Sequence, residues 1–149
     1  MSASNTFESD VLLLLLNNTN IANLGDATGV RGSTTAGSVF VALHTADPGE
    51  AGTQATSEAT YTGYARVAVA RSSGGWTISG TAPTQAANAA TVTFGACTAG
   101  SNTITHFSIG DTSSGATKIL LSGALTASLA VSAGITPQFS AGQLTATCD

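Results

Sequence analysis

Residues 39–44 read VFVALH, and this short stretch indicates the fold class. Valine, valine and leucine occupy every second position, which is the period of a β-strand and not of a helix. The same alternation returns in residues 64–69, which read YARVAV, and in residues 103–109, which read TITHFSI. No strand-like segment alternates with a long helical one, so Rossmann-type and TIM-barrel folds are excluded.

Turn signals separate about eight such segments, for example the Asp47-Pro48-Gly49 turn after the first strand. The segments expected to form strands are residues 39–44, 64–69, 76–78, 91–94, 103–109, 118–125, 128–131 and 143–148. Short strands at this spacing are typical of antiparallel sandwiches and barrels. The sequence therefore predicts a mainly β protein built from antiparallel strands.

The N-terminal segment follows a different pattern and predicts a short helix over residues 5–17. Ser4 or Thr6 can cap its start, and Glu8 and Asp10 lie in its first turn, where the helix dipole favours acids. Two consecutive asparagines follow and can end it.

Phe7, Val11, Leu14 and Leu15 share one side of this helix at helical spacing, but further leucines make it apolar nearly all round. Such a helix is expected to be buried on more than one side, within the chain or against another subunit. Glycine-rich residues 18–38 follow as a loop or extended arm. We therefore expect residues 1–38 to form a helix and arm, and residues 39–149 to form the β-sandwich, within a single domain.

The composition is dominated by small residues. The chain has 26 alanines, 24 threonines, 17 serines and 17 glycines, so 84 of its 149 residues are small, while 8% are charged. Soluble monomers usually carry about a quarter charged residues. The scarcity of charge suits a protein docked in an assembly, although a secreted or adhesive β-domain has a similar composition.

The net charge of −4, with only 4 basic residues, excludes the cationic surface that nucleic acid or an anionic membrane requires. The longest apolar run, residues 11–16, is far shorter than a membrane span. No basic segment precedes it, so we expect no export signal and assembly in a cytoplasm. Cys97 and Cys148 fit no metal motif and are expected to be free thiols, with a disulfide between them left open.

The sequence nominates no catalytic, cofactor-binding or metal-binding residues. Residues 110–118 read GDTSSGATK, but a phosphate-binding loop needs lysine directly after its last glycine. His44 and His106 lie in expected strands without a GxSxG or HExxH motif. The carboxylates are too scattered to suggest a glycosidase pair. We therefore expect a protein that is not an enzyme.

Four side chains combine bulk with a polar group, as interface residues often do: Tyr61, Tyr64, Arg66 and Trp76. Trp76 is expected to fill the core instead. Arg66 is expected to pair with an acid of the loop at residues 47–58 or with one from a neighbouring subunit. The candidate interface residues are Phe7, Val11, Leu15, Tyr61, Tyr64 and Arg66.

Residues 43–69 read LHTADPGEAGTQATSEATYTGYARVAV, which resembles a segment of small structural proteins of tailed bacteriophages. Three weaker blocks agree: residues 7–25 with NNTNIANLGD, residues 96–110 with ACT and THFSIG, and residues 121–125 with LSGAL. The resemblance covers almost the whole chain, and proteins of this group carry names that include capsid decoration protein and tail-fibre-like protein.

The resemblance implies a jelly-roll sandwich that decorates a phage capsid. Such a cement protein binds the major capsid protein on the outside of the head and bridges neighbouring capsomers, and the resemblance supplies no catalytic residues. We expect a homo-oligomer, with a dimer favoured over a trimer, located at the capsid surface of the virion. The alternatives are a tail-fibre or baseplate component, structural or receptor-binding, and a glycan-cleaving enzyme.

Overall fold

The computed structural model describes residues 3–22, 32, 35–80 and 84–148. It contains one helix and nine strands in these residues, and every sheet pairing with a defined register is antiparallel. The prediction of a mainly β protein with antiparallel sheets is confirmed. A jelly-roll topology stays a prediction.

The chain forms two compact units. Unit 1 comprises residues 1–38, 70–91 and 140–149, and unit 2 comprises residues 39–69 and 92–139. The predicted helix is thus grouped with strands from the region assigned to the sandwich. The division of the sequence at residue 38 stays a prediction, and the predicted arm lies largely outside the described residues.

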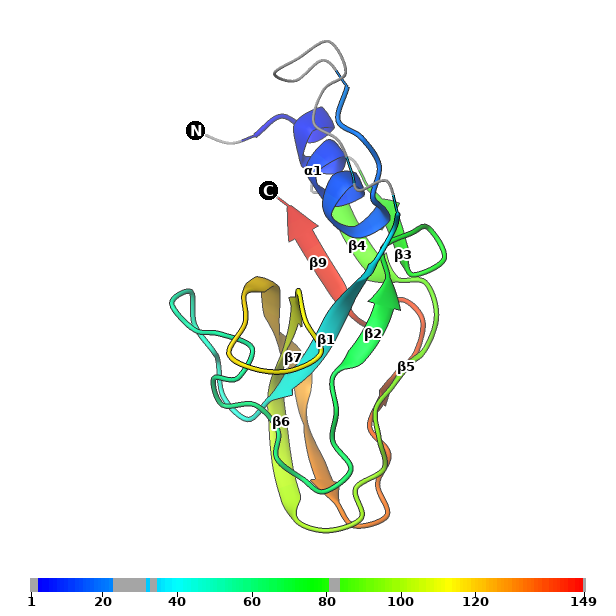
Figure 1. Ribbon diagram of the computed structural model, residues 1–149. Helices are drawn as coiled ribbons and strands as arrows, with labels where there is room; N and C mark the ends of the chain where they lie inside the picture. Colours follow the sequence, from blue (N-terminus) through cyan, green and yellow to red (C-terminus); the bar gives the residue numbers. More distant parts are fainter. Residues whose placement is uncertain (1–2, 23–31, 33–34, 81–83, 149) are drawn as a thin grey trace. The chain divides into compact units, whose positions relative to one another are not determined.

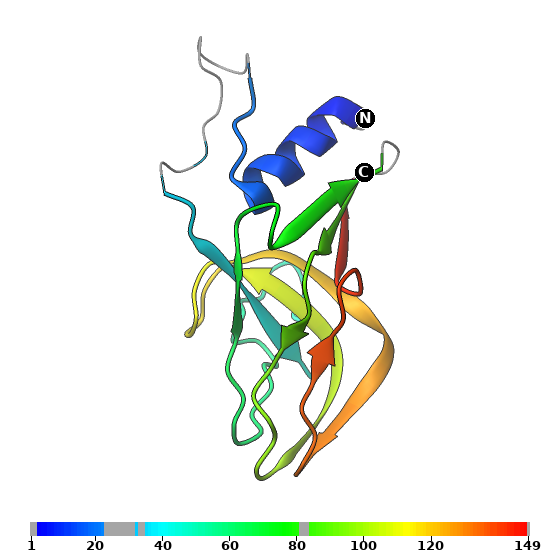
Figure 2. The same cartoon turned by 90° about the vertical axis from the view of Figure 1, so that its right-hand side faces the viewer.

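Unit 1 consists of helix α1 and a three-stranded sheet. The helix spans Asn5–Asn17 and packs against the sheet β3-β4-β9, whose strands are Trp76–Ser79, Thr84–Asn88 and Thr145–Cys148 (Figure 1 and Figure 2). Asn88 stabilises one end of the sheet, because its Nδ2 donates to two carbonyls and its Oδ1 accepts the Leu144 N–H at 2.9 Å.

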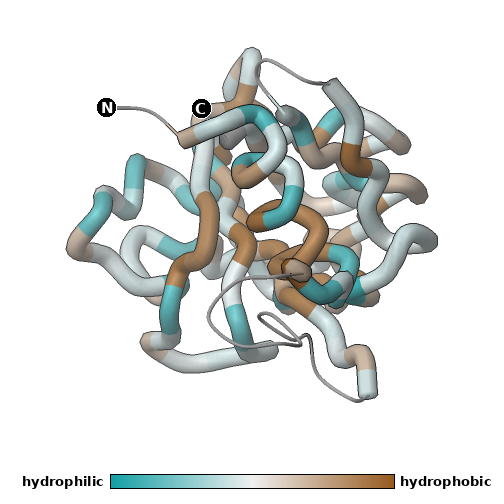
Figure 3. Tube along the Cα trace, turned by 90° about the horizontal axis from the view of Figure 1, so that it is seen from above, coloured by the Kyte–Doolittle hydropathy of each residue, from teal (hydrophilic) through white to brown (hydrophobic). Residues whose placement is uncertain are grey.

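The helix begins and ends as its sequence predicts. The Ser4 hydroxyl accepts the Phe7 N–H at 3.4 Å, and Asn18 ends the helix in a left-handed conformation with φ of 56°. Full burial is confined to one stripe, Glu8, Leu12 and Leu16, although the apolar run is longer and appears in brown in Figure 3. Leu13, Leu14 and Leu15 are partly buried, so burial around the rest of the helix is incomplete within the described residues. No described helix has the length and apolar character of a membrane span.

Unit 2 contains a four-stranded sheet in the order β2-β1-β6-β7. Its strands are Val67–Ala70, Ser38–His44, Ser101–Gly110 and Ile119–Ser132, and a short pair joins β5 (Val92–Thr93) to β8 (Gln138–Phe139) (Figure 1). The alternation in β1 puts Val41 and Leu43 on one face, where both are fully buried. His44 lies on the opposite face and belongs to a buried polar cluster.

Two strands that the sequence predicted separately, residues 118–125 and 128–131, form one long strand. The register of β7 against β6 jumps from Leu129 opposite Ile104 to Ala124 opposite His106, so residues 125–128 bulge out of the ladder. A bulge interrupts the alternation without ending the strand. Strands β4 and β8 were not predicted.

Candidate functional site

The chemically richest part of the molecule is a polar cluster inside unit 2, which we call the Arg66 cluster. Its members are His44, Gln54, Glu58, Tyr64, Arg66 and Ser108. Strands β1 and β6 supply the histidine and the serine, on the same face of the sheet because Ala42 pairs with Ser108 and His44 with His106. The long loop after β1 crosses that face and supplies the other four.

An ion pair between Arg66 and Glu58 is the centre of the cluster. The arginine Nε lies 2.7 Å from Glu58 Oε1 and Nη2 lies 2.8 Å from Oε2, so the pair is bidentate. The Arg66 side chain is 1% exposed and that of Glu58 is 19% exposed. The hydrogen bond with Glu58 raises the pKa of Arg66, which stays charged.

The remaining Arg66 donors hold the loop between β6 and β7. Nη1 donates to the Thr112 carbonyl and to the Thr117 hydroxyl, each at 3.2 Å, and Nη2 donates to the Gly115 carbonyl at 2.7 Å. Nη1 also reaches Gln54 Oε1 at 3.2 Å. All five guanidinium N–H groups therefore have acceptors within the chain, and none is left for a ligand.

Tyr64 links the ion pair to the sheet. Its hydroxyl donates to Glu58 Oε1 at 2.8 Å and accepts the Leu43 N–H at 3.1 Å. Burial is the largest of the effects that raise the pKa of this phenol, so the group stays neutral. The rings of Tyr61 and Tyr64 meet edge-on with their centroids 5.5 Å apart, and the ring of Tyr64 stacks on that of Phe94 with a centroid distance of 6.2 Å.

His44 and Ser108 form a second half of the cluster, and both side chains are fully buried. The His44 Nδ1–H donates to the Thr56 carbonyl at 2.8 Å, so Nε2 of the neutral ring accepts the Ser108 hydroxyl, also at 2.8 Å. Burial lowers the pKa of His44 and favours this neutral ring.

Gln54 connects the two halves of the cluster. Its Nε2 donates to the Phe40 carbonyl at 2.9 Å and lies 3.4 Å from Ser108 Oγ, while its Oε1 accepts from Arg66. The amide lies over Gly110, where a Cβ atom would overlap it. Glycine at this position therefore makes room for the side chain that joins the histidine to the ion pair.

The predicted site residues fall in two places. Tyr61, Tyr64 and Arg66 come together in unit 2, and Arg66 has the first of its two expected partners, an acid of the loop after β1. Phe7, Val11 and Leu15 lie on α1 in unit 1. Trp76 is fully buried, as predicted.

Sequence reasoning missed Gln54, Ser108 and Gly110, which no local pattern marks. Within the described residues no group of three or more metal-ligating side chains occurs. Cys97 is a free, buried thiol, in agreement with the prediction for that residue. The cluster can fix loops in place, but its polar groups already satisfy one another.

Comparison with known proteins gives the family. No curated protein matches the chain. A family model described as podophage GP4 fiber I protein gp80 matches residues 2–147. The chain belongs to this fibre protein family. The expectation of a structural protein of a tailed phage is thereby confirmed, and the family description supports the tail-fibre alternative better than the capsid-cement interpretation.

Proposed function

We propose that this chain is a structural component of the phage tail fibre, that it works as a homo-oligomer, and that it is not an enzyme. The observation that carries the proposal is the match of residues 2–147 to a fibre protein family. Its role is mechanical: repeated contacts between copies, and with neighbouring tail proteins, maintain the fibre.

The Arg66 cluster supports a mechanical role over a catalytic one. Ser108, His44 and the Thr56 carbonyl are ordered like a nucleophile, a base and an orienting group, but the serine and histidine are 0% exposed. A substrate cannot reach such a pair without opening the sheet. The network stiffens two long loops instead, as a part under load requires.

The helix supports association between copies. Phe7 is 43% exposed, and Val11 is half-buried one turn further on the same side. An apolar side chain of this size gains free energy when a neighbour covers it. We therefore keep Phe7, Val11 and Leu15 as candidate contacts, whereas Tyr61 and Arg66 are buried and have little surface to offer a neighbouring copy.

The test is the position of the chain in the virion. Cryo-electron microscopy of particles labelled with a Fab fragment against this protein should show the label on the tail, and its copy number should be small relative to the major capsid protein. Label spread over the symmetry-related positions of the head would contradict the proposal. That result would restore capsid decoration, with the major capsid protein as partner.

A further inference from the structure

Among the described residues, the longest strand of unit 2 is paired with another strand on one side only. Strand β7 spans 14 residues at the end of the sheet β2-β1-β6-β7 and pairs, among the described residues, with β6 alone. Its regular register from Leu121 to Ala124 against Ile109 to His106 shows that the strand is well formed there. Its outer edge offers backbone donors and acceptors to a further strand.

Little in the β7 sequence protects this edge. Residues 119–132 contain no charged residue and no proline, and Ser122 and Ala124 are small and exposed. Proteins usually block an edge of this length with charges, proline or bulges. The bulge at residues 125–128 leaves the segment before it available. By contrast, the opposite edge strand β2 has four residues and lies between Arg66 and Arg71.

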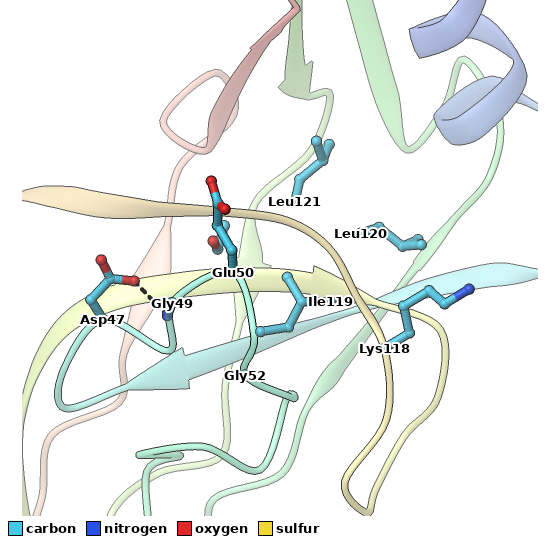
Figure 4. A pocket seen from close by; sticks show the side chains of 9 residues that line it. Asp47, Gly49, Glu50, Gly52, Lys118, Ile119, Leu120 and Leu121 are labelled. Atoms are coloured by element: carbon cyan, nitrogen blue, oxygen red, sulfur yellow. Dashed lines mark hydrogen bonds between the residues drawn. The ribbon is translucent and has the colours of Figure 1, made fainter.

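Charged groups surround the available segment at its two ends. An open hollow of about 460 Å³ lies along it, lined by Asp47, Gly49, Glu50, Gly52 and residues 118–122. Lys118 lies at one end of this hollow, and Asp47 and Glu50 lie toward the other end (Figure 4). None of these three exposed side chains makes an ion pair within the described part of the chain.

We propose that two copies of this chain pair through this segment, residues 118–124, with their β7 strands antiparallel across a two-fold axis. Antiparallel pairing of a strand with its own copy reverses the ends, so Lys118 of each copy meets Asp47 and Glu50 of the other. The same surface on both copies is then complementary in charge, which is the requirement for a two-fold interface. The uncharged strand between these ends allows close approach without repulsion. The four-stranded sheets of the two copies then join into one continuous sheet through their β7 strands.

The test is the association of the purified chain, measured by sedimentation at low salt. Lys118→Glu and Glu50→Lys should each weaken the dimer, roughly tenfold to a hundredfold, because each change replaces two attractive contacts by repulsive ones. Mixing the two variants should restore a dimer, since the acid introduced at position 118 of one variant then meets the base introduced at position 50 of the other. Asp111→Lys changes the net charge as Glu50→Lys does, lies outside the hollow, and should associate like the unmodified chain.

Hydrogen exchange tests the strand pairing itself. Amides of residues 121–124 should exchange more slowly in the dimer than in the Lys118→Glu variant. An unmodified chain that stays monomeric, charge variants that associate normally, a mixture without rescue, or unprotected β7 amides would each overturn the proposal. None of these results bears on the position of the chain in the virion, so the fibre role and this interface can fail separately.

Discussion

Arg66 connects several segments of unit 2 through one side chain. Its guanidinium joins Glu58, Gln54 and the loop between β6 and β7, and its side chain is 1% exposed. Arg66→Ala should lower the free energy of unfolding by about 3 kcal/mol, because it leaves the Glu58 carboxylate and the buried Gln54 oxygen without the guanidinium. Urea denaturation followed by circular dichroism measures the change.

Two further variants test this explanation. Arg66→Lys keeps the charge but loses the bidentate geometry, so its stability should lie between those of the unmodified chain and Arg66→Ala. Thr126→Ala shortens an exposed side chain of unit 2 that lies outside the cluster and should change the stability by less than about 0.5 kcal/mol. If Arg66→Ala were as harmless as Thr126→Ala, the cluster would not be a source of stability.

His44 predicts a pH dependence of folding. Burial lowers the pKa of this ring below its ordinary value of 6.5, so the unfolded chain takes up a proton that the folded chain resists. The contribution is complete above pH 6.5 and is lost as the pH falls from 6.5 through the lowered pKa of the folded state. The slope is at most about 1.4 kcal/mol per pH unit for one such group.

The measurement is the free energy of unfolding between about pH 8 and pH 5. His106→Gln should keep the decline, whereas His44→Gln should remove most of it even if the variant is less stable throughout. A decline that survives in His44→Gln would assign the effect to other groups.

At this scale the sequence could predict a role for Arg66 but not its full surroundings. The arginine stands out because bases are scarce, and an acid is available eight residues earlier at Glu58. Gln54 is an ordinary loop residue in sequence. Its position over Gly110 depends on the path of the loop across β1 and β6, which is set by tertiary packing and not by local propensity.

At the scale of elements, α1 is held to unit 1 by a cation from outside the helix. Its last turn contains no basic residue, but Arg71 donates from Nε to the Leu15 carbonyl and from Nη2 to the Leu14 carbonyl, each at 2.8 Å. These contacts satisfy carbonyls that a helix end leaves free and place a positive charge at the negative end of the dipole.

Arg71→Met keeps the length of the side chain but removes these donors. It should lower the free energy of unfolding by about 1–2 kcal/mol and speed the exchange of amides in the last turn of α1. Hydrogen exchange followed by mass spectrometry measures both the free energy of unfolding and the exchange in α1. Arg71→Lys should recover part of the lost stability. Unchanged exchange in α1 would mean that apolar packing of Leu12 and Leu16 holds the helix without help from Arg71.

The elements that the sequence predicted are those with strong local signals. Helix α1 has its cap at Ser4 and a terminating Asn18, and β1 has three large apolar residues in alternation. Strand β4 reads TQAAN, which has low β-propensity. It is a strand because β3 and β9 pair with it on both sides and α1 covers it, and of these partners β9 and α1 lie far away in the sequence.

At the scale of the whole molecule, the two units are linked because the chain passes between them several times. Unit 1 is made of three separate segments, and these are connected only through residues 39–69 and 92–139 of unit 2. When unit 2 is folded, its segments keep the ends of unit 1 close. When it unfolds, unit 1 must close two long flexible loops at a cost in entropy. The stability of unit 1 should therefore depend on unit 2.

The aromatic residues allow each unit to be followed separately. The chain has one tryptophan, Trp76, which is buried in unit 1, and two tyrosines, Tyr61 and Tyr64, which both lie in unit 2. Tryptophan fluorescence and tyrosine absorbance should report the same urea midpoint in the unmodified chain. Arg66→Ala, a change in unit 2, should shift both midpoints together. A tryptophan midpoint that stays in place while the tyrosine midpoint falls would mean that unit 1 folds independently, even though its segments are joined only through unit 2.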